Sequence, residues 1–282
     1  MTKQLRVATL QMCSGTNPDE NLAVALSLLD RTASAGATVA VLPEFWDYMG
    51  PEEEAGAIAT TVPGPLTEAL AAKAREHGIF LYAGSVHERT GDDSRLYNTT
   101  VLIEPSGEIA ARYRKIHLFD VSFAGQFAHQ ESATIRPGTE IVTGHIDDVP
   151  IGFSTCYDLR FPELFRILAL RGAEVIFLPA AFTLHTGKDH WEILLRARAI
   201  ENQCFLVAAA QFGKHPGGSV TYGRAMIVDP WGLVLAQAPD GTAMAVADLD
   251  FSALERIRNE LPSLRNRRVD QYIWPDEEVA GR

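Results

Sequence analysis

Three residue types that cooperate in acyl transfer, a carboxylate, an amine and a thiol, each follow a strand-like stretch of this sequence. Glu44 follows residues 39–43, Lys115 follows 109–114, and Cys156 follows 151–155. The end of a buried strand presents a side chain at the mouth of a sheet, and the backbone N–H groups of a following turn favour an anion there. The three residues therefore predict a cysteine-dependent site for acyl transfer.

The predicted nucleophile needs activation. A thiol with its ordinary pKa of about 8.5 is mostly protonated at pH 7, so it requires a base, a positive neighbour or both. Glu44 and Lys115 supply one of each. Taken singly, Glu44 or Lys115 would more often be a solvated surface charge and Cys156 a small core residue. All three occur together in sequence blocks that resemble those of a known enzyme family. This joint occurrence favours the catalytic interpretation.

The surrounding segments resemble the nitrilase superfamily, whose signature is a Glu-Lys-Cys triad in this order. The matching blocks are 42–44 (LPE), 113–120 (YRKIHLFD) and 156–163 (CYDLRFPE). They are similar to the amidase branch, which includes omega-amidase and deaminated glutathione amidase. The resemblance extends from Arg6 to about Tyr272. It implies hydrolysis of a non-peptide amide through a thioester on the cysteine.

In the mechanism that this resemblance implies, Glu44 takes the thiol proton and Cys156 attacks the amide carbonyl. Lys115 and the backbone N–H of Tyr157 stabilise the oxyanion, and losing one such donor typically costs about 2.7–4 kcal/mol. The family places a second glutamate near the lysine, and Glu131, in the run 127–132 (FAHQES), matches it as a positioning residue. Taken alone, Glu131 would be an ordinary loop acid. No cofactor or metal is implied.

The other two cysteines, Cys13 and Cys204, adjoin apolar runs and are expected to pack in the core. Three cysteines without paired spacing argue against a disulfide framework and favour a reducing compartment. The eight histidines show neither H-x-x-x-H nor H-E-x-x-H spacing, so a zinc hydrolase has little support.

Composition narrows the classes of partner. The chain has 282 residues, 46% of them hydrophobic, and a net charge of −11, which disfavours nucleic acid and anionic membranes. The short basic run 264–268 does not overturn that. No stretch approaches the roughly 18 apolar residues of a membrane span, and the N-terminus lacks a signal-peptide pattern. These features predict a cytoplasmic protein.

Apolar runs alternate with helix-like segments, which indicates an α/β architecture with covered sheets. Proline near helix starts and glycine after helix ends supply boundary signals. Strands are predicted at 5–12, 38–42, 79–86, 99–104, 108–113, 151–155, 175–178, 204–211, 222–228, 234–236 and 243–249, and helices at 17–35, 65–77, 162–171 and 189–201.

A faint internal repeat divides the chain into two related halves. Segments 103–107 and 228–232 align at an offset of 125 residues, as do Phe80 and Phe205, and 41–43 resembles 177–179. Two related sheets, each with helices on one side, could bury their remaining faces against one another. This predicts a four-layer αββα sandwich, which the family resemblance also implies, built as a single carbon–nitrogen hydrolase domain over residues 1–282.

Substrate-binding residues are expected next to the nucleophile. Arg160, four residues beyond Cys156, has a planar guanidinium suited to a carboxylate, and related carbamoylases have an arginine at the matching position. The alternative is a structural pair with Asp158 or Glu163. The segment 179–187, including Phe182 and Thr183, should line the pocket.

The primary hypothesis is hydrolysis of a carboxylate-bearing, deaminated glutathione-like amide, which releases 2-oxoglutarate and Cys-Gly. Alternatives are action on 2-oxoglutaramate, hydrolysis of N-carbamoyl amino acids, and a catalytically silent binding module on the same fold. A C-terminal arm at about 261–282 suggests a homodimer, because 261–272 resembles a segment that packs across an interface. The other interpretation of this arm is a surface tail.

Overall fold

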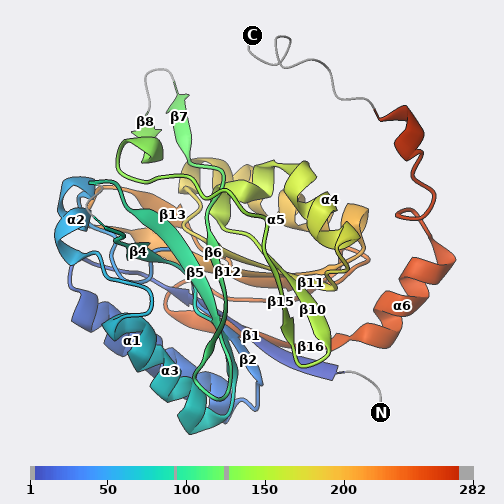
Figure 1. The fold of residues 1–282 in the computed structure, drawn as a ribbon, viewed down its shortest axis with the longest axis horizontal. Helices are drawn as coiled ribbons and strands as arrows, with labels where there is room; N and C mark the ends of the chain where they lie inside the picture. Colours follow the sequence, from blue (N-terminus) through green and yellow to red (C-terminus); the bar gives the residue numbers. More distant parts are fainter. Residues whose placement is uncertain (1–3, 92–93, 124–126, 273–282) are drawn as a thin grey trace.

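The computed structural model describes residues 4–91, 94–123 and 127–272 and shows a curled β-sheet with helices on its outer sides (Figure 1). The first half begins with β1 (Gln4–Met12), α1 (Pro18–Ser34), β2 (Val39–Val41), α3 (Pro65–His77) and β3 (Phe80–Tyr82). The second half begins with β10 (Val149–Phe153), α4 (Pro162–Leu170), β11 (Val175–Ala180), α5 (Leu184–Asn202) and β12 (Phe205–Lys214). The order β-α-β-α-β is therefore repeated.

The remaining elements complete the two halves. In the first half they are η1 (Glu52–Glu54), α2 (Ala55–Ile58), β4 (Val86–Glu88), β5 (Tyr97–Ile103), β6 (Ile109–Arg114), β7 (Asp120–Phe123), β8 (Phe127–Gln130), η2 (Glu131–Ala133) and β9 (Thr143–Ile146). In the second they are η3 (Cys156–Arg160), β13 (Val220–Tyr222), β14 (Met226–Val228), β15 (Val234–Gln237), β16 (Ala243–Asp250), α6 (Phe251–Glu260) and η4 (Val269–Gln271).

The strand pairing repeats as well. β1, β2 and β3 run parallel, and β5 returns antiparallel to β3 and pairs with β6. In the second half β10, β11 and β12 run parallel, and β14 returns antiparallel to β12 and pairs with β15. The last strand of each half pairs with the first strand of the other half: β9 pairs with β10, and β16 pairs with β1. This exchange ties the halves together.

Alternating side chains assign the strand faces to layers, because successive residues of a strand point to opposite sides. Val7 and Val39 share one core cluster with Phe177 and Phe205 of the other half. The opposite faces of the strands pack separately, one under α1 and α3 and the other under α4 and α5. Three apolar interfaces thus separate four layers, and the predicted αββα sandwich is confirmed.

The repeat offset of 125 residues also preserves these faces. Phe80 and Phe205 both pack between the sheets. Leu81 and Leu206, one position later, both pack beneath helices. The weak sequence repeat therefore corresponds to equivalent positions in the two halves.

Local signals set the helix ends. Asn17 caps α1 by accepting bonds from the N–H groups of Asp19 and Glu20. Gly78, whose φ of 63° is in the left-handed region, caps the C-terminus of α3. α5 starts at Leu184, five residues before the predicted start. α6 was not predicted, although Asp250 caps it through the N–H groups of Ser252 and Ala253.

Three further sequence expectations were wrong. The strand expected at 79–86 is divided into β3 and β4, and that at 222–228 is divided into β13 and β14. Both breaks include glycines with positive φ, Gly84 and Gly223, whose backbone conformation interrupts an extended strand. Cys13 is exposed because it lies one residue beyond the end of β1, whereas Cys204 is buried as expected.

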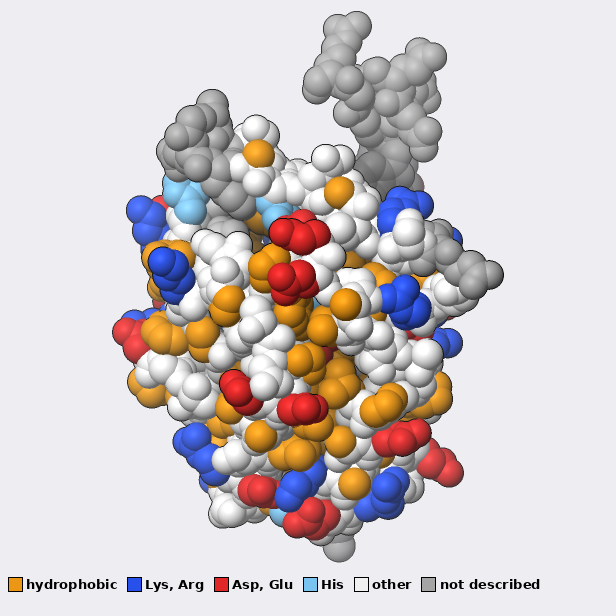
Figure 2. Space-filling view, turned by 90° about the vertical axis from the view of Figure 1, so that its left-hand side faces the viewer, with side chains coloured by type: hydrophobic (Ala, Val, Ile, Leu, Met, Phe, Trp, Pro, Cys, Tyr) orange, Lys and Arg blue, Asp and Glu red, His pale blue; other side chains and the backbone are white. Residues whose placement is uncertain are grey.

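The surface seen from the left-hand side of Figure 1 carries basic and acidic side chains interspersed around hydrophobic ones (Figure 2). On this face the acidic excess of the chain does not form one continuous patch. Among the described residues, no helix has the length and apolar character needed to cross a lipid bilayer.

Candidate active site

Glu44 lies in the loop after β2. Hydrogen bonds join this loop to the segment between β3 and β4. Ser85 donates its N–H to Pro43 O at 3.1 Å, and its hydroxyl oxygen accepts the N–H of Phe45 at 3.0 Å. A side chain at Gly84 would place its Cβ 2.2 Å from Pro43 O, so glycine allows this close approach. The broken strand therefore holds the loop that carries the carboxylate.

Lys115 follows β6, the strand beside β5. Its backbone N–H donates to Asn98 O on β5 at 2.9 Å. Its Nζ lies 2.9 Å from Glu44 Oε1 and 2.8 Å from Glu131 Oε2. The structure thus brings together three of the predicted residues from separate loops, at sequence separations of 71 and 16.

Cys156 opens the short helix η3, three residues after the end of β10, with a φ of +46°. A left-handed conformation is costly for a residue with a β-carbon and marks a sharp turn held by its surroundings. The holding group is Asp158, whose Oδ2 accepts the Thr155 N–H at 2.8 Å and the Tyr113 hydroxyl at 2.6 Å. The turn at Cys156 is thereby tied to β6, the strand that Lys115 follows.

The charged cluster is almost completely shielded from bulk solvent. Glu44 and Lys115 are each 2% exposed, Glu131 is 4% and Cys156 is 8%. Burial by itself lowers the pKa of Lys115, but the charges of Glu131 and Glu44 outweigh it and raise the pKa well above its ordinary value. Lys115 is therefore an ammonium ion, suited to stabilise developing negative charge.

Cys156 is held as a neutral thiol. Burial raises the pKa of the thiol well above its ordinary value, the Glu44 charge raises it further, and Lys115 opposes them. Hydrogen bonding to Glu44 also raises the pKa of the thiol, and Glu44 Oε2 accepts the N–H of Ala181 at 2.8 Å. A nucleophilic role for this thiol would require removal of its proton, and Glu44 is the carboxylate that adjoins it.

Glu131 opens η2 after the hairpin formed by β7 and β8. Its Oε2 accepts the N–H of Phe119 at 2.6 Å in addition to its bonds from Lys115. The carboxylate is thus fixed by backbone and directs the ammonium group. The positioning role that the family resemblance implies for Glu131 stays a prediction.

Two residues of the site were missed by the sequence interpretation. Asn98 Nδ2 donates to Glu44 Oε1 at 2.8 Å and to Glu131 Oε1 at 3.3 Å, so it bridges both carboxylates. Asp158 was considered only as a partner for Arg160. The available signal for Asn98 was an amide inside the otherwise β-forming run 97–103, and for Asp158 an acid two residues after the thiol.

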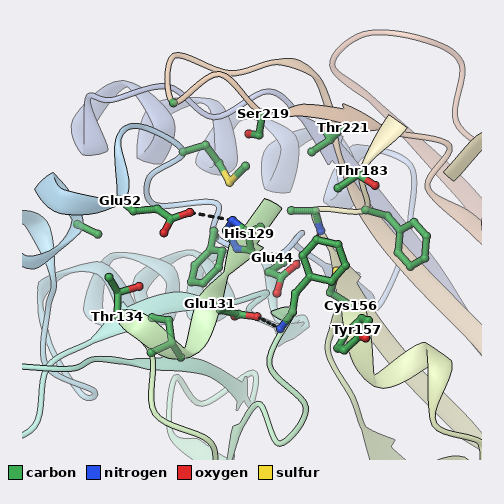
Figure 3. A pocket seen from close by; sticks show the side chains of 18 of the residues that line it. Glu44, Glu52, His129, Glu131, Thr134, Cys156, Tyr157, Thr183, Ser219 and Thr221 are labelled. Carbon is green, nitrogen blue, oxygen red and sulfur yellow. Dashed lines mark hydrogen bonds and ion pairs between the residues drawn. The ribbon is translucent and has the colours of Figure 1, made fainter. Parts of the chain in front are cut away.

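A cavity of about 440 Å³ opens over the cluster and is lined by all the predicted site residues, including Tyr157, Phe182 and Thr183. Its volume is within the usual range for small-molecule sites, about 300–1,000 Å³. In Figure 3, Cys156 and Tyr157 lie on one side of this cavity, and Glu52 and Thr134 lie on the other. The reacting groups thus line a pocket large enough for a small organic substrate.

Arg160 also lines the cavity. Its guanidinium lies over the Phe182 ring, 5.1 Å from the centroid, and its Nη1 is 3.3 Å from His190 Nδ1. The alternative pairing with Asp158 or Glu163 is not formed in the described structure, since Asp158 instead bonds Tyr113, Thr155 and His117. The guanidinium therefore lies in the cavity wall, against an aromatic ring.

One group of side chains in the described part of the chain has the spacing of metal ligands: Asp30, Glu76 and His77, on the outer helices. Lys73 Nζ lies 2.6 Å from Asp30 and 3.0 Å from Glu76. Its ammonium group already balances these carboxylates. This group lies outside the cavity and has no part in the site described above.

Comparison with known proteins agrees with this geometry. The carbon-nitrogen hydrolase family profile matches residues 6–259. Deaminated glutathione amidase of Synechocystis sp. is 41% identical over 268 residues, covering 94% of this chain and 98% of that protein. Human omega-amidase NIT2 is 36% identical over 267 residues, covering 95% of this chain and 96% of that one.

A solved structure shows the same fold. The NitFhit protein of C. elegans superposes with a TM-score of 0.91 at 37% identity, over 96% of this chain and 67% of that chain. Family profile, sequence relatives and fold agree over nearly the whole chain. This chain therefore belongs to the carbon–nitrogen hydrolase family.

Proposed function

We propose that this protein hydrolyses a linear amide through a thioester on Cys156, and that its substrate is deaminated glutathione. The observation that carries the proposal is the buried cluster in which Lys115 Nζ lies within 3 Å of Glu44 and Glu131, beside Cys156 at the floor of the cavity. A base, an ammonium and a nucleophile are the groups that acyl transfer requires.

The chemistry follows from the positions of these groups. Glu44 accepts the thiol proton as the sulfur of Cys156 bonds to the amide carbon. The carbonyl oxygen becomes an oxyanion, stabilised by the Lys115 ammonium and the N–H of Tyr157. As the carbon–nitrogen bond breaks, Glu44 delivers the proton to the departing amine. Glu44 then deprotonates a water, whose oxygen bonds to the thioester carbon. As the carbon–sulfur bond breaks, Glu44 returns the proton to sulfur, which restores the thiol and releases the carboxylic acid.

The substrate assignment has two supports. Relatives covering nearly the whole chain at about 40% identity carry the name deaminated glutathione amidase. Arg160 lines the cavity on the nucleophile's side, where it would bind the carboxylate of the 2-oxoacyl half. Hydrolysis would release 2-oxoglutarate and Cys-Gly, so the first leaving group is an amine and not ammonia.

Action on 2-oxoglutaramate is the second candidate, favoured by the 36% identity to omega-amidase NIT2. Its acyl half is the same and its leaving group is ammonia. The N-carbamoyl amino acids and a silent binding module are less supported, the latter because Cys156, Glu44 and Lys115 are all present and in contact with the cavity.

A parallel assay decides among these candidates. We expect kcat/KM to be higher for deaminated glutathione than for 2-oxoglutaramate, carbamoylated amino acids and simple nitriles. Cys156→Ala should abolish turnover while the folded protein remains soluble. Rapid quenching followed by mass spectrometry should find the acyl mass on the peptide that contains Cys156. Retained hydrolysis by Cys156→Ala would contradict the thiol mechanism.

We also propose that residues 1–282 form one domain that acts in the cytoplasm as a homodimer. The three free cysteines support a reducing compartment. Leu261, Val269 and Tyr272 in the described part of the C-terminal arm are each more than half exposed, and a partner subunit would cover them. The rest of the predicted arm, 273–282, lies outside the described residues. Light scattering coupled to size exclusion tests the dimer.

A further inference from the structure

The cavity continues beyond the reacting groups on the Glu44 side. Tyr157, Phe182 and Arg160 lie together on the side of the nucleophile. Another part of the wall, next to Glu44, is formed by a cluster of packed side chains: Phe45, Tyr48, Ala55, Ile135 and, stacked on Phe45, His87. In the proposed mechanism Glu44 protonates the departing amine, so the leaving half of the substrate lies beside Glu44. Ammonia would need none of this additional space.

His87, on β4, is a buried imidazole in this extension that the mechanism does not use. It is 6% exposed. Its ring is stacked on Phe45, with centroids 4.1 Å apart and planes at 12°, and it meets the edge of Tyr48. Because Phe45 directly follows Glu44, the imidazole is held next to the loop of the proposed general base.

Asp47 orients this ring. Its carboxylate is fully buried and accepts the backbone N–H of His87 at 3.0 Å and the ring Nδ1–H at 3.1 Å. The backbone of Asp47 is fixed in turn, because its carbonyl accepts Asn21 Nδ2 from α1 at 2.8 Å. A carboxylate that holds one ring nitrogen of a histidine presents the other in a defined direction.

The other ring nitrogen, Nε2, faces the cavity. Within residues 4–91, 94–123 and 127–272, the hydrogen-bond partners of the His87 ring are the Asp47 carboxylate oxygens, both on Nδ1. Nε2 has no partner in this part of the chain, but it is not completely buried and retains accessible surface. His87 lines the cavity, and that surface therefore opens into it.

We propose that Nε2 of His87 hydrogen bonds the leaving half of a substituted amide, so that the Asp47–His87 pair selects substrates whose leaving group is an amino acid or peptide amine. This inference rests on the proposed amidase function and specifies the substrate class of that same site. The acyl half contacts Arg160 and the nucleophile, whereas the departing half extends over Phe45 toward the imidazole. His87 is a specificity residue with no part in proton transfer.

The test compares two substrates with the same acyl half, deaminated glutathione and 2-oxoglutaramate. His87→Asn places an amide nitrogen near the Nδ1 position, so it can still donate to Asp47, but it deletes Nε2. The ratio of kcat/KM for deaminated glutathione to that for 2-oxoglutaramate should fall about 3- to 10-fold, as expected for one hydrogen bond. The loss should appear mainly as a higher KM for deaminated glutathione.

His87→Gln is the matched control, because its longer side chain places an amide near the Nε2 position. It should recover part of the lost ratio. An unchanged ratio in His87→Asn, or an equal loss on both substrates, would overturn the inference and assign His87 a structural role. A second measurement does not depend on a variant: in the wild-type protein, the product Cys-Gly should shift the Nε2 resonance of His87, and no shift would refute the contact.

The outcomes also separate this inference from the proposed function. A wild-type enzyme that cleaves only 2-oxoglutaramate remains an amidase, but the leaving-half contact would be wrong. A wild-type enzyme that cleaves neither amide contradicts the proposed function itself. Cleavage of both amides with the predicted change in ratio supports both.

Discussion

Replacing Lys115 with methionine should damage stability and catalysis for two separable reasons. Its ammonium lies 2.9 Å from Glu44 and 2.8 Å from Glu131, and all three side chains are at most 5% exposed. Methionine retains the length of the side chain and removes the charge. Two neighbouring carboxylates would then be buried without their shared cation. Breaking a buried ion pair in this way costs about 3–5 kcal/mol of unfolding free energy.

The catalytic loss has a different origin. Lys115 is proposed to donate to the oxyanion, and removing one such donor costs about 2.7–4 kcal/mol in the transition state, or about 100- to 1,000-fold in kcat. Urea denaturation measures the first effect, and steady-state kinetics on deaminated glutathione measures the second. Because the donor acts mainly in the transition state, KM should change much less than kcat.

A second substitution separates the two effects. In Lys115→Met/Glu131→Gln, one of the two unpaired charges is removed while the shape of the site is kept. We expect about 1 kcal/mol or more of stability to return, since residues in one ion-pair network are strongly coupled. Activity should not return. A Lys115→Met protein that shows near-normal kcat and a raised KM would refute the oxyanion role, and additive stability losses would refute the shared-cation argument.

Three further outcomes test other parts of the site. Tyr113→Phe removes the 2.6 Å bond to Asp158 and should cost about 1.5–3 kcal/mol of unfolding free energy in urea. Burial lowers the pKa of His129, but the bond to Glu52 outweighs it and raises the pKa. The two side chains are 30% and 51% exposed, so the pair stabilises the fold by only about 0.5 kcal/mol. This stabilisation is fully present below the unfolded-state pKa of His129, about 6.5, and is lost as pH rises through the higher pKa of the folded state. His129→Gln should accordingly lower Tm by about 1–2 °C at pH 6 and not at pH 9; the opposite pH trend would show that the pair is not the cause. Because burial raises the pKa of Cys156, its alkylation by iodoacetamide should accelerate steadily from pH 7 to 9, whereas a plateau in this range would indicate a preformed thiolate.

The sequence alone predicted the four layers, which the structure confirms, and three of the residues that meet at the cavity. Glu44, Lys115 and Cys156 each follow a strand, and local alternation of apolar residues indicates which stretches form buried strands. The offset between Phe80 and Phe205 revealed two related halves that the structure confirms. These features are encoded within short segments or in simple repetition, so they can be recognised without knowing which segments meet.

Contacts between distant segments were decided only by the tertiary structure. Asn98 reaches Glu44 across 54 residues, and Asp47 orients His87 across 40. No local pattern states which buried carboxylate a given amide or imidazole will meet, because that depends on how the strands are ordered and how their connecting loops turn. The break at Gly84 is such a turn, needed because the backbone there lies against Pro43. The sequence thus predicted which groups the structure brings together at the cavity, and the packing of loops at the strand ends decided which other residues hold and surround them.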